Sequence, residues 1–187
     1  MKTTSVLFAG VGGQGIVLAS RILAQAAFES GLMVKETELH GMAQRGGSVI
    51  SQVRFGFEVH SPLILRGEAS RLVATEELEG LRYLDYLRPG ARVILNRRRI
   101  APAGGGDGYP SDTAEALEKR GFKVTAVPAP EAAREIGNPR IENTVLLGAL
   151  SRHLDLPVAA WEKAIAALVP SRTLEVNLRA FRAGRRF

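Results

Sequence analysis

Short apolar runs alternate along this chain with longer stretches of helical spacing. An apolar run that ends in a turn former predicts a strand, and apolar residues three or four positions apart predict a helix. On this basis we expect strands over residues 5–9, 32–38, 48–55, 93–95 and 122–127. The same pattern predicts helices over residues 16–28, 76–87, 112–120, 130–136, 143–154, 158–168 and 174–183.

Glycine and proline residues mark the expected boundaries of these elements. Gly56 followed by residues 57–60 suggests a hairpin continuation of the third strand, which Pro62 ends. Pro89 and Gly90 stop the preceding helix. The order β-α-β-β-α-β-α-β, followed by helices, indicates a three-layer α/β/α sandwich with a mixed, mostly parallel sheet. Without an internal repeat or a long linker, residues 1–187 are expected to form a single domain.

Composition excludes several kinds of chemistry. The chain has no cysteine, which rules out disulfides, a cysteine nucleophile, thiolate zinc sites and cysteine-ligated iron–sulfur clusters. No run of about 18 apolar residues and no secretory signal occurs, so we expect a cytoplasmic protein without a membrane span. Its three histidines suggest no serine–histidine–acid or metal-ligand set, so no catalytic or metal-binding residue is assigned.

The net charge of +6 suits nucleic acid, an acidic partner protein or no particular partner. The basic residues are scattered apart from residues 97–99 and 185–186, which we interpret as a solvated loop and a frayed tail. Aromatic residues make up only 6% of the chain, which leaves little for stacking bases. We therefore expect no nucleic-acid partner.

A glycine loop follows the first predicted strand. The string Gly10-Val11-Gly12-Gly13-Gln14-Gly15 fits G-x-G-x-x-G, and Glu36 lies where a ribose-binding acid would follow. The loop could hold a pyrophosphate at the helix N-terminus, or it could be only a tight turn that needs glycine. A stand-alone NAD(P)- or flavin-dependent oxidoreductase that uses residues 10–15 is therefore the alternative function.

A second glycine loop follows the second predicted strand at once. Together, GVGGQGI at residues 10–16 and TELHGMAQRGGSVISQVRFG at residues 37–56 resemble the gamma-type domain of 2-oxoacid:ferredoxin oxidoreductases, and the small subunit of the indolepyruvate type in particular. Further stretches that carry the resemblance are Ser61-Pro62-Leu63-Ile64, Gly67-Glu68-Ala69, Asn96, Asn143 with Leu147-Gly148-Ala149-Leu150, and Asn177 with Ala180-Phe181. Ser70 departs from the Gly-Glu-Ala-Asp pattern expected there and puts one local contact in doubt.

The resemblance implies an α/β domain without its own cofactor. In this family the partner subunit is expected to carry thiamine diphosphate, magnesium and iron–sulfur clusters. The complex oxidatively decarboxylates 2-oxoacids, arylpyruvates in the indolepyruvate type, to an acyl-CoA with reduction of ferredoxin, and coenzyme A is its cosubstrate. The chain would then work only with a large thiamine-dependent subunit and would meet ferredoxin through the complex.

Both glycine loops follow the carboxyl ends of strands, where ligands bind in open α/β sheets. If the two strands are neighbours, the loops meet, and His40 and Arg45 stand beside free backbone N–H groups. His40 either holds its own loop or transfers a proton, Arg45 contacts the partner subunit, and Gln14 bonds the second loop. The candidate residues that face the interface or the active site are Gly10, Gly12, Gly13, Gln14, Gly15, His40, Gly41, Gln44, Arg45, Gly46, Gly47 and Ser48.

Overall fold

The computed structural model describes residues 3–40, 47–101 and 109–187. Its core is one six-stranded sheet in the order β2-β3-β1-β4-β5-β6. The strands are β1 (Thr4–Val11), β2 (Met33–His40), β3 (Ser48–Gly56), β4 (Ala69–Ala74), β5 (Leu87–Asn96) and β6 (Lys123–Val127). Only β3 runs against its neighbours, so the expected mixed, mostly parallel sheet is confirmed.

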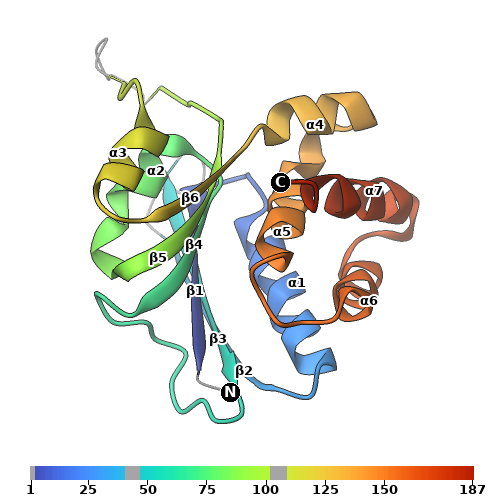
Figure 1. The fold of residues 1–187 in the computed structure, drawn as a ribbon. Coiled ribbons are helices and arrows are strands. Elements are labelled where there is room, and N and C mark those ends of the chain that lie inside the picture. Colours follow the sequence, from blue (N-terminus) through green and yellow to red (C-terminus); the bar gives the residue numbers. More distant parts are fainter. Residues whose placement is uncertain (1–2, 41–46, 102–108) are drawn as a thin grey trace.

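Helices cover both faces of this sheet, as a three-layer sandwich requires. Figure 1 shows α2 and α3 on one face, and α1 with the four C-terminal helices on the other. The helices are α1 (Ile16–Glu29), α2 (Glu77–Arg82), α3 (Thr113–Lys119), α4 (Ala129–Ile136), α5 (Glu142–Ser151), α6 (Val158–Leu168) and α7 (Leu174–Gly184). Short 3-10 turns lie at Leu84–Tyr86, Pro139–Ile141 and Ser171–Thr173.

Each face of the sheet has its own apolar core. Val6 and Phe8 of β1 pack toward α1 and α5, whereas Leu7 and Ala9 pack toward the α2 and α3 side. All four side chains are fully buried, because β1 is central and covered on both faces. This explains why β1 reads as a continuous apolar run. The larger core, under α1 and α5, also holds Trp161, whose ring stacks on Phe181.

Three local predictions were wrong. Residues 57–60 form no strand, and the chain instead crosses toward β4, which the sequence analysis missed. Ser70 and Arg71 interrupt the apolar pattern of β4, although Ser70 is buried and donates to the carbonyl of Ser5 on β1. The predicted helix over residues 76–87 ends at Arg82.

The start of β5 is the third difference. The strand begins at Leu87 and runs through Pro89 and Gly90. Because β6 pairs with β5 only from Arg92 onward, the missing N–H of Pro89 deprives no neighbouring strand on that side. Pro89 and Gly90 therefore do not stop the preceding helix, which ends at Arg82, but lie within a strand that is unpaired on its β6 side at this point.

Candidate functional site

The carboxyl ends of β1, β4 and β5 lie together at one edge of the sheet. After β1 the chain enters α1 on one face, and after β4 it enters α2 on the opposite face (Figure 1). At such a switch point the two connections diverge and leave a crevice, where open α/β sheets bind their ligands. The edge between β1 and β4 is therefore the first place to seek a site.

The first glycine loop is shaped by close contacts at this edge. A β-carbon on Gly10 would lie 1.7 Å from Oγ1 of Thr75, the residue that follows β4. Gly15 has φ of 72° and caps α1, and a β-carbon there would lie 2.4 Å from Nδ2 of Asn143. Both glycines are required by backbone shape and neighbours, without any ligand.

Gln14 fastens the loop to the end of β4. Its Oε1 accepts hydrogen bonds from the amide of Val11 at 2.8 Å and from Oγ1 of Thr75 at 2.5 Å. Its Nε2 donates to the carbonyl of Thr75 at 3.3 Å. The sequence predicts a bond from Gln14 to the second glycine loop, but its partners among the described residues are Val11 and Thr75.

The two glycine loops do meet, but not for the reason expected. Strands β1 and β2 are not neighbours, because β3 lies between them. Antiparallel pairing of β1 with β3 places Val11 opposite Ser48, and the amide of Gly12 donates to the carbonyl of Gly47 at 2.9 Å. The end of the second loop therefore joins the first through the start of β3.

Ser48 connects this junction to the other helical layer. Its hydroxyl donates to Oε2 of Glu79 and lies 2.8 Å from the hydroxyl of Tyr83. The buried Glu79 carboxylate also accepts from Arg82 at 3.0 Å. Because these contacts satisfy Ser48 internally, its observed role is to hold β3 against α2.

The start of α5 closes the other side of the crevice. Nδ2 of Asn143 donates to the carbonyl of Gly15 at 3.0 Å. The Glu142 carboxylate accepts from Nδ2 of Asn96 at 3.1 Å and pairs with Arg98. Nδ2 of Asn96 also donates to the carbonyl of Thr75 at 3.1 Å, so Asn96 connects the ends of β4 and β5 to α5.

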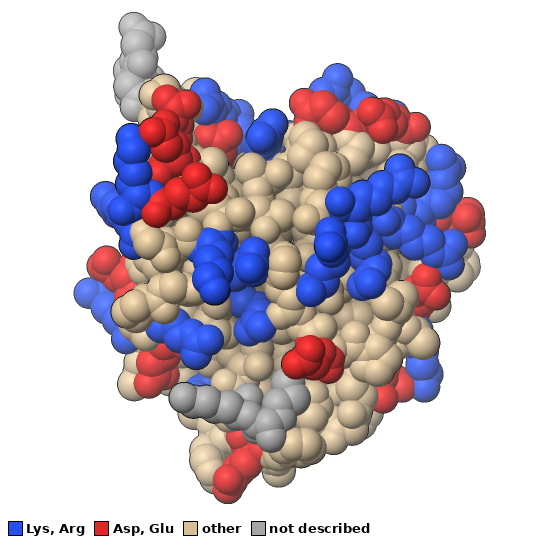
Figure 2. Space-filling model, viewed as in Figure 1, with Lys and Arg blue, Asp and Glu red and all other residues tan. Residues whose placement is uncertain are grey.

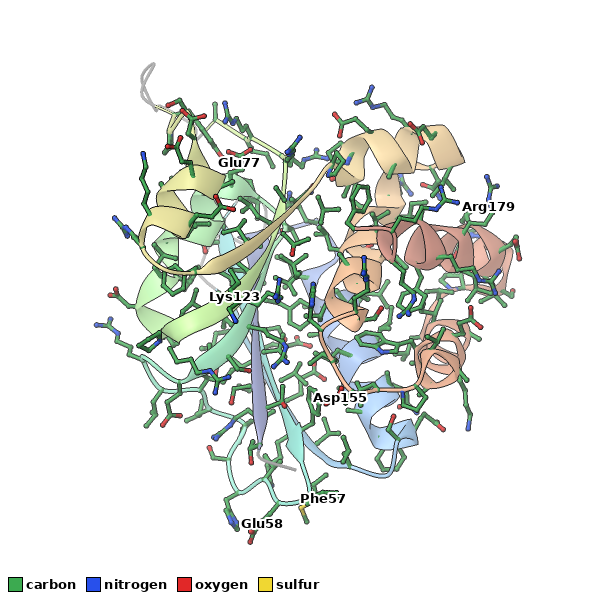
Figure 3. The ribbon with its side chains drawn as sticks, in the orientation of Figure 1. Phe57, Glu58, Glu77, Lys123, Asp155 and Arg179 are labelled. Carbon is green, nitrogen blue, oxygen red and sulfur yellow. The ribbon has the colours of Figure 1, made fainter. Side chains whose placement is uncertain are left out.

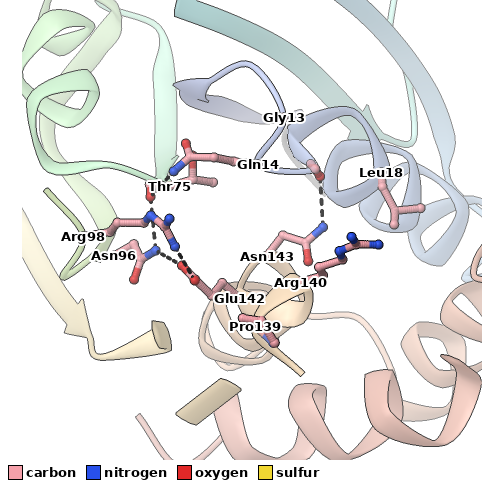
Figure 4. A pocket seen from close by; sticks show the side chains of 11 residues that line it. Gly13, Gln14, Leu18, Thr75, Asn96, Arg98, Pro139, Arg140, Glu142 and Asn143 are labelled. Atoms are coloured by element: carbon pink, nitrogen blue, oxygen red, sulfur yellow. Dashed lines mark hydrogen bonds and ion pairs between the residues drawn. The ribbon is translucent and has the colours of Figure 1, made fainter. Parts of the chain in front are cut away.

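These contacts border a cavity of about 300 Å³, shown in Figure 4. The buried Oδ1 of Asn96 has no hydrogen-bond partner in the described part of the chain. Arg98 is half-buried, and the exposed Arg140 forms no ion pair within the described ranges. The lining residues are Gly13, Gln14, Gly15, Leu18, Thr75, Asn96, Arg98, Pro139, Arg140, Glu142 and Asn143.

Part of the expected site lies at this edge. Gly10, Gly12, Gly47 and Ser48 are there, and Gly13, Gln14 and Gly15 line the cavity itself. The backbone of His40 pairs with Val49 at the end of β2. Outside the described residues lie the side chain of His40 and the whole of Gly41, Gln44, Arg45 and Gly46.

Sequence reasoning missed Thr75, Arg98, Arg140 and Glu142 as cavity residues. A usable signal was the polar residue directly after each buried strand, Thr75 after β4 and Asn96 at the end of β5. Residues 97–99 were interpreted as a solvated loop, and Arg97 and Arg99 are indeed exposed, but Arg98 and Arg99 also form ion pairs. Arg98 pairs with Glu142, and Nε of Arg99 lies 3.0 Å from Oε2 of Glu77.

The alternative dinucleotide site is not supported. Glu36, the candidate ribose-binding acid, lies on β2, which β3 separates from β1. Its Oε1 already accepts from the hydroxyl of Ser20 on α1 at 2.5 Å. Burial raises the pKa of Glu36, which weakens it further as an ionised acceptor for ribose hydroxyls.

A metal-binding cluster and a membrane-spanning helix are both absent from the described residues. Within residues 3–40, 47–101 and 109–187, no three histidine or acidic side chains cluster so that they could hold a metal ion. No helix in those ranges is both long and apolar enough to cross a membrane.

Residues 5–187 match the model of the family described as pyruvate ferredoxin/flavodoxin oxidoreductase. Among curated proteins, the chain is 39% identical over 192 residues to the indolepyruvate oxidoreductase subunit IorB of Thermococcus kodakarensis. That alignment covers 98% of this chain and 95% of the relative.

Solved structures share the fold. A keto/oxoacid ferredoxin oxidoreductase gamma subunit from Geobacter sulfurreducens is 25% identical, with a TM-score of 0.74 over 97% of this chain and 95% of that one. The chain also superposes, at a TM-score of 0.78 and 25% identity, on a 2-oxoglutarate:ferredoxin oxidoreductase from Magnetococcus marinus with 2-oxoglutarate, coenzyme A and succinyl-CoA bound. That match covers 100% of this chain and 31% of the other.

Proposed function

Since the chain belongs to the pyruvate ferredoxin/flavodoxin oxidoreductase family, we propose that it is the small subunit of an indolepyruvate-type 2-oxoacid:ferredoxin oxidoreductase. The observation that carries the proposal is its 39% identity, over nearly its whole length, to an indolepyruvate oxidoreductase subunit. The relatives named 2-oxoglutarate synthase subunits are less similar, at 32% identity or below. Sequence similarity thus favours indolepyruvate over 2-oxoglutarate as the substrate of the complex.

The proposed reaction is shared between subunits. The complex takes a 2-oxoacid and coenzyme A to an acyl-CoA and carbon dioxide, and two electrons pass to ferredoxin. This chain has no cysteine and so offers no thiolate for an iron–sulfur cluster. We therefore assign thiamine diphosphate, magnesium and the clusters to the larger subunit, and a docking and positioning role to this chain.

We also assign the cavity at the sheet edge to an anionic group delivered within the complex. Arg140 provides a guanidinium group with no ion pair in the described ranges, and Arg98, which is paired with Glu142, also lines the cavity. Guanidinium groups suit phosphates, and coenzyme A is the phosphorylated reactant. The bound coenzyme A in the related Magnetococcus marinus enzyme agrees with such a ligand.

Reconstitution tests the main proposal. The small chain alone should be colourless and inactive, and adding the purified large subunit should give coenzyme A-dependent reduction of ferredoxin or a dye with indolepyruvate. Turnover by the isolated chain, once mass spectrometry has excluded contamination, would contradict the division of labour. Failure of the two chains to associate would contradict the subunit assignment itself.

Steady-state kinetics of the complex test the cavity. Arg140→Ala should raise the KM for coenzyme A several-fold, on the order of 1 kcal/mol or more of lost binding, with little change in kcat at saturation. The matched control is Arg172→Ala, which changes an exposed arginine of the turn before α7 that does not line the cavity. An unchanged KM in Arg140→Ala would remove coenzyme A from this cavity without affecting the subunit assignment.

A further inference from the structure

Three basic residues stand in one row across the sheet, away from the cavity. The register places Arg71 of β4 opposite Arg92 of β5, and Arg92 opposite Lys123 of β6. On the same strands Val73, Ile94 and Val127 pack toward α1 and α5, and alternation puts the three basic side chains on that face too. We call Arg71, Arg92 and Lys123 the cationic row.

The row lies where helical cover ends. In the next row toward the cavity, Phe8, Val73 and Ile94 are buried. Helix α5 ends at Ser151, and the sheet beyond it carries charge in place of apolar side chains. Figure 2 shows basic side chains over β5 and β6 on this face, with a second basic group over α7. Lys123 and Asp155 are labelled in Figure 3.

Little acidic charge balances this group. Burial lowers the pKa of Arg71, and the positive charges of Arg88 and Arg92 lower it further. Burial and the positive charges of Arg92, Arg152 and Arg71 likewise lower the pKa of His153. Among the described residues, the carboxylate of Asp155 raises the pKa of Arg71 and so acts against these like charges. Within the described ranges none of Arg88, Arg92, Lys123 and Arg152 forms an ion pair.

Only one member of the row has a clear structural task. Arg71 donates from Nε and Nη2 to the carbonyl of His153, at 3.0 and 2.6 Å, and so holds the chain after α5. The side-chain bond of Arg92 is a 3.4 Å contact to Thr125, and Lys123 is exposed. A lysine on an edge strand can simply discourage sheet pairing, but that does not explain Arg92 on an inner strand.

Holding these cations side by side opposes folding of the isolated chain. Neighbouring strands lie about 4.8 Å apart, and like charges directly opposite each other destabilise a sheet. An ordinary solvated surface would mix in carboxylates, as α3 does with Glu115 and Lys119. An arrangement that is unfavourable alone becomes favourable when negative charge covers it.

We infer that the cationic row is a docking surface for a carboxylate-rich segment of the larger subunit. The inference rests on the proposed function and adds where the partner binds and by what chemistry. A protein occupant is favoured over a nucleic acid because Tyr86 and Phe122, the aromatic residues nearest to Arg88 and Lys123 in the sequence, pack against the core on the opposite face of the sheet and so do not offer their rings to bases here. Carboxylates can pair with guanidinium groups bidentately, which suits Arg92.

Charge reversal tests the docking surface. The double variant Arg92→Glu, Lys123→Glu leaves Arg71 and its bonds in place. The control is Lys35→Glu, Arg172→Glu, which changes the net charge equally at two other exposed cations; Lys35 lies on β2, the opposite edge of the sheet. Binding to the purified larger subunit is measured by calorimetry at about 50 and about 500 mM salt, a range over which exposed charges become screened.

We expect the wild-type affinity to fall with salt. The row variant should bind at least about tenfold more weakly at low salt and lose most of the salt dependence, whereas the control stays within about threefold of wild type. Unchanged affinity and salt dependence in the row variant would overturn the inference and leave the proposed function standing. No binding by the wild type would overturn both.

Two further measurements distinguish a docking surface from a structural role of the row and from a nucleic-acid site. The isolated double variant Arg92→Gln, Lys123→Gln should have a melting temperature no lower than that of the isolated wild-type chain. The reason is that the substitutions relieve the like-charge repulsion within the cationic row. A lower melting temperature together with wild-type affinity would make the row a structural feature. Binding of a DNA duplex that the row variant loses, with affinity for the larger subunit intact, would assign the surface to nucleic acid.

Discussion

Gly148 of α5 and Gly184 of α7 let the two helices meet backbone to backbone. A β-carbon on Gly148 would lie 2.1 Å from the carbonyl oxygen of Phe181, and one on Gly184 would lie 1.9 Å from the carbonyl oxygen of Val145. Neither obstacle is a flexible side chain, so only movement of the helices could make room. This contact holds the C-terminal helix against the element that carries Glu142 and Asn143 of the cavity.

Gly148→Ala should therefore destabilise the chain by about 1–3 kcal/mol or more, because overpacking at a backbone contact cannot be relieved by a rotamer change. Chemical denaturation monitored by circular dichroism measures the effect. Ala149→Gly on the same helix is a control for helix propensity, although it also removes a buried methyl group. A Gly148→Ala protein as stable as wild type would show that α7 does not pack as described.

Gly15→Val should cost about 1 kcal/mol or more from the positive φ alone, and more from the clash with Asn143. The matched control is Gly13→Val, which has φ of 99° and no neighbour within 4 Å of its β-carbon position. The difference between the two melting temperatures isolates the contact with Asn143. Equal losses would mean that backbone strain accounts for the whole effect.

Asn96→Leu should destabilise the chain by about 1–3 kcal/mol, because the buried side chain bridges the carbonyl of Thr75 and the carboxylate of Glu142. The expected loss lies toward the low end of that range, since both acceptors keep another donor, Gln14 and Arg98 respectively. Equilibrium denaturation measures it. A variant of unchanged stability would show that this bridge contributes nothing to the fold.

His153 should make the chain acid-sensitive. Burial, then the charges of Arg92, Arg152 and Arg71, lowers its pKa from 6.5 to about 4. The unfolded chain therefore binds a proton more readily than the folded one between about pH 6.5 and 4, so His153 costs stability as pH falls through that window. Melting temperatures from pH 7 to 4 should fall less steeply for His153→Gln. Identical slopes would show that His153 does not titrate in this way.

His40→Ala and Arg45→Ala should leave the isolated chain about as stable as wild type but weaken assembly or turnover of the complex. The buried strand β3 follows these residues and supplies core contacts, and binding residues are commonly carried on the loops between such strands. Truncating a buried interfacial arginine commonly costs about 2 kcal/mol or more of binding. A lowered melting temperature with unchanged affinity would make both residues local structural groups.

The local pattern of the sequence was enough to predict much of the fold and the family resemblance. The fold class, most helices and strands, and the resemblance that led to the family all follow from apolar periodicity and from the two glycine loops. These signals lie within a few residues of one another, because side chains repeat every two residues in a strand and every 3.6 in a helix. The glycines at Gly13 and Gly15 belong to the same class, since their positive φ is a property of the local turn.

Tertiary structure decided what depends on residues far apart in the chain. Strand β4 was missed because Arg71 breaks its apolar pattern, and only its place between β1 and β5 makes it a strand. The insertion of β3 between β1 and β2 brought Gly12 to Gly47, and the packing of α5 brought Glu142 to Asn96. Arg71, Arg92 and Lys123 are scattered in the sequence and become a row only through the register of parallel strands. Register and strand order arise from pairing between distant segments, which no local periodicity encodes.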